Sequence, residues 1–229
     1  MEPTTSMTTC MAAYFWLVAG ACVVKAFGVN QRAVDGVFFA LVLGTMFLIY
    51  SAVMRERCGT VAFGPVLGAT FGPWVFMLGG TMAALHFLPG WRQPFSNTFG
   101  YMVILIPALH ATSKLIKILS DSQQTSIELI KRNPSLMLNE FAGSTFEATI
   151  LKLQTEGLVR KDADAIAEFQ KIVGIKDTVA DFVWYMLVGI VAITTSFNLI
   201  LNHSCQKTVM KDEVFVPDEP EQTAYIVDD

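Results

Sequence analysis

No Asp, Glu, Lys or Arg occurs between Arg57 and Arg92. A bilayer core is about 30 Å thick, and about 20 apolar residues cross it as a helix. Charged residues are also scarce in the whole 229-residue chain, at 16%, whereas soluble domains contain about 25%. The deficit is concentrated in a few long runs, which is typical of membrane-spanning segments.

Several other features are missing. The sequence contains no Walker loop, GxGxxG, HExxH or GxSxG motif and no CxxC pair, so we predict no enzyme activity and no catalytic, cofactor-binding or metal-binding residues. A net charge of −4 and a pI near 5.4 argue against nucleic-acid binding, which needs a basic surface. The four cysteines, Cys10, Cys22, Cys58 and Cys205, each lie in or beside an apolar run, and we expect free thiols that behave as small hydrophobic side chains.

The apolar runs predict an all-α protein, a multi-pass transmembrane helical bundle of about five spans. We place four of them in a membrane bundle of residues 1–119, over about 9–27, 36–54, 61–88 and 98–119, and the last within 182–205. Lys25, near the end of the first span, is expected to extend to the lipid headgroups. The run 98–119 contains Pro107 and two lysines in its second half, so a half-buried surface helix is the alternative there.

Small and polar side chains in the runs suggest how the helices pack. Gly64, Gly68 and Gly72 form two successive GxxxG motifs, and such small residues let helix backbones approach closely in lipid. The last run contains Thr194, Thr195 and Asn198, which we expect to face another helix and to form hydrogen bonds there.

Aromatic and basic residues at the ends of the runs predict the membrane interface. Trp and Tyr rings are enriched at headgroup depth. The residues expected there are Trp91, Arg92, Tyr101, Trp184 and Tyr185.

Residues 120–181 have the composition of a soluble segment and predict a small amphipathic helical subdomain between the last two spans. Residues 206–229 form an acidic tail that we expect to be extended. With five spans, the N-terminus, Arg55, Arg57 and the subdomain would share one side of the membrane. The excess of Lys and Arg there favours a subdomain on the inside and a tail on the outside.

Two segments carry a family resemblance. Pro89–Tyr101 and Thr194–Cys205 resemble segments of multi-pass membrane proteins from large icosahedral DNA viruses, especially those that infect algae. The resemblance implies a structural protein of the host-derived internal virion membrane, anchored there beneath the capsid. The implied partners are the lipid bilayer, capsid or minor capsid proteins, and other membrane proteins or further copies of the chain.

The residues alone leave two other functions open. The Gly-Pro steps at Gly64-Pro65 and Gly72-Pro73, together with the polar patch near Asn198, also fit a small membrane transporter or channel. An accessory subunit of a cellular membrane complex is the third hypothesis, and it would place the chain in a cellular membrane.

Overall fold

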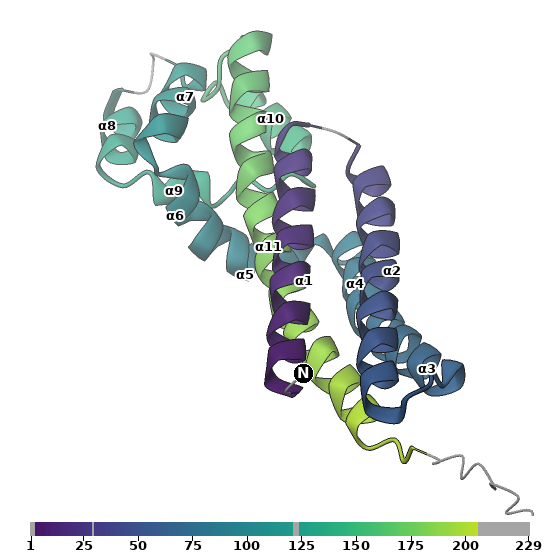
Figure 1. Ribbon diagram of the computed structural model, residues 1–229. Helices are drawn as coiled ribbons and strands as arrows, with labels where there is room; N and C mark the ends of the chain where they lie inside the picture. Colours follow the sequence, from purple (N-terminus) through teal and green to yellow (C-terminus); the bar gives the residue numbers. More distant parts are fainter. Residues whose placement is uncertain (1–2, 29, 121–123, 206–229) are drawn as a thin grey trace, which may run out of the picture.

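The computed structural model describes residues 3–28, 30–120 and 124–205; the predicted acidic tail, 206–229, lies outside the described residues. The predicted all-α fold is confirmed, because the regular elements of the described residues are helices, and the β pairing among them is an isolated bridge between Leu119 and Val159. Figure 1 shows a bundle of long helices with a group of short helices beside one end.

Four helices or helix series in the described residues are long and apolar enough to cross a membrane. They are α1 (Pro3–Ala26), α2 (Gln31–Cys58), the series α3 (Phe63–Pro73), η1 (Trp74–Gly79) and α4 (Gly80–Phe87), and α11 (Ala163–Leu201). They coincide with the spans predicted at 9–27, 36–54, 61–88 and 182–205, and they are compatible with an integral membrane protein.

Local signals set the ends of these helices. The Asn30 side chain accepts hydrogen bonds from the backbone N–H groups of Arg32 and Ala33 and so caps α2. Gly59 ends α2 in the left-handed conformation (φ 75°), which costs glycine little. Asp162 caps α11 through the N–H of Ala165. Pro73 lies inside the third span and is followed by the π-helical turn η1.

The core of the bundle is aromatic and aliphatic, with α11 packed against α1 and against the α3 series. Trp74, Tyr14 and Tyr50 are buried at its centre. The ring of Tyr14 lies directly on Gly189 of α11, where any Cβ atom would overlap it. Glycine at this position therefore permits the close approach of α1 and α11.

The predicted packing role of Gly64, Gly68 and Gly72 is wrong within this chain. A Cβ at any of the three would meet no atom within 4 Å. The buried face of α3 is formed instead by Val66, Ala69, Thr70 and Pro73. Val66 and Thr70 lie two positions after Gly64 and Gly68, a turn of about 200° on a helix, so the glycines face away from the bundle.

The polar patch of the last span also points elsewhere than predicted. The hydroxyl groups of Thr194 and Thr195 donate to carbonyls of their own helix, Ile190 and Val191, at 2.8 and 2.9 Å. Asn198 is exposed. The two threonines satisfy their hydroxyl groups locally, so they do not need a neighbouring helix.

The chain between the third span and the subdomain is a series of short, bent pieces. They are η2 (Pro89–Arg92), α5 (Gln93–Phe95), η3 (Ser96–Gly100), α6 (Tyr101–Ile104), η4 (Pro107–Leu109) and α7 (Ala111–Ile118). Pro89–Ile104 and Pro107–Ile118 meet at 88°, so a fifth span exists only if this bent pair counts as one crossing. Pro107 restricts the residue before it to extended backbone, and the bend follows from this.

The subdomain is built on the first half of α11. Its other helices are α8 (Gln124–Arg132), α9 (Ser135–Leu138), α10 (Phe146–Thr155) and α7. Phe141, Phe146 and Phe169 form the centre of a separate hydrophobic cluster. The domain boundaries predicted at 119/120 and 181/182 differ from the structure, since α7 packs into the subdomain and α11 runs through the second boundary without a break.

A disulfide bond joins Cys58, at the end of α2, to Cys205, just after α11. The two Cα atoms are 5.2 Å apart, within the range for a disulfide. The expectation of four free thiols is therefore wrong for this pair, while Cys10 and Cys22 are free. Arg57 is bound at the same end, where its side chain donates to the Ile200 carbonyl at 2.6 Å.

Candidate functional site: an ionic network at the subdomain end of the bundle

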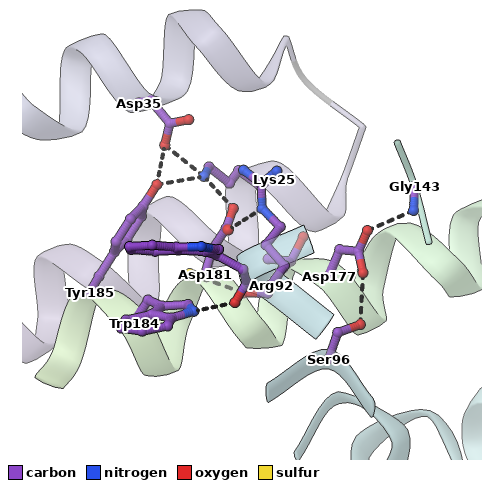
Figure 2. A network of polar contacts seen from close by, with 12 residues as sticks. Lys25, Asp35, Arg92, Ser96, Gly143, Asp177, Asp181, Trp184 and Tyr185 are labelled. Atoms are coloured by element: carbon purple, nitrogen blue, oxygen red, sulfur yellow. Dashed lines mark hydrogen bonds and ion pairs between the residues drawn. The ribbon is translucent and has the colours of Figure 1, made fainter. Parts of the chain in front are cut away.

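Four charged side chains from four elements meet where the bundle joins the subdomain, and we call Lys25, Asp35, Arg92 and Asp181 the ionic network (Figure 2). Lys25 Nζ lies 2.6 Å from Asp35 Oδ1 and 3.0 Å from Asp181 Oδ2. Arg92 Nε lies 2.6 Å from Asp181 Oδ1. The network thereby links the end of α1, the start of α2, η2 and the middle of α11.

The ionic network is neutral in sum and largely hidden from solvent. The side chains of Lys25 and Asp181 are 1% and 4% exposed, and those of Asp35 and Arg92 are 26% and 20% exposed. Burial alone would lower the pKa of the Arg92 guanidinium, but the adjacent Asp181 carboxylate outweighs it and raises that pKa. The Lys25 ammonium pairs with two carboxylates of the chain and not with lipid headgroups, as the prediction for a lysine near the end of a span would have had it.

Two tyrosines surround the network. The Tyr185 hydroxyl donates to Asp35 Oδ1 at 3.1 Å and accepts from Lys25 Nζ at 3.4 Å. The Tyr14 hydroxyl donates to the Tyr185 carbonyl at 2.7 Å, and the Tyr185 ring stacks on Phe38. The Tyr185 side chain is buried in the bundle core, so it does not face lipid, and its predicted depth at the membrane interface stays a prediction.

The other predicted interfacial residues are divided between two places. Trp91 and Trp184 stack with their ring centres 6.2 Å apart, and the Trp184 indole N–H donates to the Trp91 carbonyl at 2.9 Å. Arg92 belongs to the ionic network. Tyr101 packs against the subdomain core. The membrane depth of the Trp91–Trp184 pair stays a prediction.

A second set of polar contacts continues along α11 toward the subdomain. Asp177 accepts from the Ser96 hydroxyl and from the Gly143 N–H, each at 2.7 Å (Figure 2). The neighbouring Lys176 is buried and donates to Asn97 Oδ1 and to the Leu138 carbonyl, each at 3.0 Å. These bonds fix α11 against η3 and against the loops around α9, so the bundle and the subdomain share one rigid axis.

The spacing of charges is compatible with a bilayer that has the ionic network at one face. Asp35 and Arg55 are 20 positions apart on α2, and Asp181 lies 20 positions before the last residue of α11. Each interval is about 30 Å along a helix axis, the thickness of a hydrocarbon core. The disulfide end therefore lies at the opposite face from the network and the subdomain.

This placement corrects the predicted grouping of the loops. Arg55 and Arg57 lie in the last turn of α2, at the disulfide end, and Figure 1 shows the start of α1 at the same end of the bundle. Lys25 and Arg92 lie in the ionic network, where the bundle joins the subdomain. The grouping was wrong because it required the run 98–119 to cross as a straight span.

The carboxylates of the ionic network are occupied by ion pairs and hydrogen bonds. Both Asp181 oxygens contact a cation, and Asp35 contacts Lys25 and Tyr185. Within residues 3–28, 30–120 and 124–205, no group of three or more His, Cys, Asp or Glu side chains is placed to hold a metal ion. A cavity of about 880 Å³ lies beside the network, lined in part by Lys25, Arg92 and Asp181.

Comparison of the chain with protein-family models, curated proteins and solved structures found no match. The functional conclusions below therefore depend on the geometry of this chain and on the resemblance of its two segments.

Proposed function

We propose that this chain is a structural integral membrane protein of a virion, which anchors the internal membrane to the overlying capsid through minor capsid proteins. The observation that carries the proposal is the single helix α11, 39 residues long, which belongs to both hydrophobic cores. A helix shared in this way holds the subdomain at a fixed height and angle above the bilayer, which is what an anchor needs.

The polar contacts support the same function. Charged side chains near the bilayer are paired with one another across four elements, and the Asp177 and Lys176 contacts hold the subdomain against α11. Such fixed pairs favour rigidity over the changing hydration that a conduction path requires. The segments with the virion resemblance lie at opposite ends of the bundle, one in η2 to α6 and one ending at Cys205.

The test begins with gradient-purified virus particles. Mass spectrometry before and after detergent stripping should find the chain in intact particles and find it lost with the lipid. Particles without the chain would refute the virion assignment. Co-purification with a cellular complex would then favour an accessory subunit, and solute flux in reconstituted vesicles would favour a transporter.

A variant tests the anchoring role itself. Inserting Gly-Gly between Val179 and Ala180 of α11 should leave the spans inserted but uncouple the subdomain, so that fewer particles assemble. The same insertion after Gly157, a turn with φ 72°, is the matched control and should have little effect. Equal assembly of both variants would contradict the rigid-anchor function.

A further inference from the structure

The cavity beside the ionic network lies at the headgroup level of the bilayer. Its lining includes Lys25 and Ala26 at the end of the first span, Gln31 at the start of the second and His86 at the end of the third. Its other wall is the subdomain half of α11. Three spans therefore have an end at this cavity. The position of the cavity in the bilayer follows from these three helix ends together.

The lining of the cavity is both polar and apolar, and large exposed hydrophobic side chains lie in it or next to it in sequence. Phe27 lines the cavity and is 83% exposed. Phe87 and Leu88, which adjoin the lining residues His86 and Pro89, are 77% and 51% exposed. Exposed hydrophobic side chains beside a cavity that also contains charged groups fit a ligand with a polar head and apolar chains.

The hydrogen-bonding state of the charged residues selects the chemistry of that head. The lining contains Lys25, Arg92 and Lys171 with Asp177 and Asp181, and Asp35 contacts Lys25 from outside the lining, so the group is neutral in sum. Both carboxylates already accept hydrogen bonds from protein donors. The carboxylates of the cavity are therefore occupied by protein donors, and the groups left for a ligand are N–H donors of the cationic side chains.

Two of the cationic side chains have N–H groups that can donate to a ligand. Only the Nε of Arg92 contacts Asp181, and the structure describes no protein partner for its two terminal amino groups. Lys171 is exposed and has no ion pair among the described residues. A guanidinium presents a planar fork that matches the oxygens of a phosphate.

We propose that this cavity binds the phosphate of an anionic phospholipid headgroup, with Arg92 and Lys171 as the donors. Its volume of about 880 Å³ suits a bound headgroup. The neutral donors Gln31, Gln170 and Ser144 complete the lining. The inference needs only that the bundle lies in a bilayer, and it is independent of the virion assignment.

The test is native mass spectrometry of the full chain in detergent, titrated with phosphatidylglycerol or with phosphatidylcholine. The wild type should retain one phosphatidylglycerol more tightly than phosphatidylcholine. Because a basic residue near an anionic surface contributes about 1 kcal/mol, or about fivefold, Lys171→Gln should weaken retention about fivefold. Arg92→Lys keeps the charge beside Asp181 but loses the fork, and we expect a loss of about tenfold.

Controls separate binding from folding and from charge in general. Lys161→Gln, an exposed lysine outside the cavity lining, should leave retention unchanged. Unfolding midpoints verify that each variant is folded, and Lys171→Glu provides a second test if Arg92→Lys does not fold.

Three outcomes would overturn the proposal. The first is equal retention of the two lipids, and the second is wild-type retention by the Lys171 variants. The third is displacement of the lipid by inorganic phosphate at equal concentration, which would assign the cavity to a soluble phosphate compound.

Discussion

Asp181 is the centre of the ionic network, so Asp181→Asn is the most informative single change. The substitution keeps the size of the side chain but removes the charge that contacts Lys25 Nζ at 3.0 Å and Arg92 Nε at 2.6 Å. The network would then contain two cations and only Asp35 as an anion. Lys25 keeps its contact with Asp35 at 2.6 Å, whereas Arg92 loses its carboxylate partner.

The expected cost follows from burial. Removing one partner of a buried ion pair costs about 3–5 kcal/mol because the other charge stays buried and unpaired. Arg92 is 20% exposed and can rehydrate in part, and Lys25 retains one carboxylate. We therefore expect Asp181→Asn to lower the free energy of unfolding by about 3 kcal/mol.

The assay is reversible unfolding of the full chain in mixed micelles, followed by tryptophan fluorescence. Trp184, three positions after Asp181, reports on this region directly. The matched control is Asp164→Asn in the exposed first turn of α11, which should cost less than about 1 kcal/mol because it removes only a helix-dipole contact.

A double-mutant cycle makes the test specific to the ion pair. Lys25→Gln combined with Asp181→Asn restores charge balance, since Asp35 and Arg92 remain. The double variant should be destabilised by less than the sum of the two single variants, by about 0.5–3 kcal/mol. Strict additivity, or a cost for Asp181→Asn no larger than that of Asp164→Asn, would refute the reasoning.

Further predictions concern the bundle and the disulfide. Gly189→Ala should lower the free energy of unfolding by about 1–3 kcal/mol because the new methyl group overlaps the Tyr14 ring. Gly68→Ala is the control and should not lower it, because the space around Gly68 is open. Equal effects of the two variants would contradict the packing of Tyr14 on Gly189. Replacing both Cys58 and Cys205 by Ser should cost about 2–4 kcal/mol, measured in the same micelles. In sealed vesicles with the cytoplasmic face outward, a membrane-impermeant maleimide added after an impermeant reductant should label wild-type Cys58 and Cys205 only once the vesicles are permeabilised, and should not label the double Ser variant. Labelling in intact vesicles would reverse the orientation.

The spans were predictable from the sequence, and the contacts between them were not. Long uncharged runs define helices in lipid because the backbone has no other donor or acceptor there. Periodicity does not show which face of such a helix points inward when lipid and core are both apolar. The glycines of α3 illustrate this, because Gly64 and Gly68 are exposed while Val66 and Thr70 are buried.

The ionic network was missed for a different reason. Lys25 was interpreted alone, as one charge near the end of a span. A usable signal was present nearby, since Asp35 stands at the start of the next run and antiparallel helices joined by a short turn bring such positions together. Asp181, directly before the last run, is 156 positions away from Lys25, and nothing local indicates that contact. The disulfide, with 147 positions between its cysteines, was hidden in the same way.

The two ends of the bundle differ in chemistry, and together they give the orientation. Lys25, Arg92 and the basic residues of the subdomain lie at one face, which the positive-inside tendency assigns to the cytoplasmic side. The disulfide bond lies at the other face, and disulfides persist in oxidising compartments outside the cytosol. One argument uses charge and the other uses redox chemistry. Both assign the subdomain end of α11 to the cytoplasmic side and the disulfide end to the opposite side. Under the proposed virion function, the subdomain would face the cytoplasmic side, where a capsid protein is made.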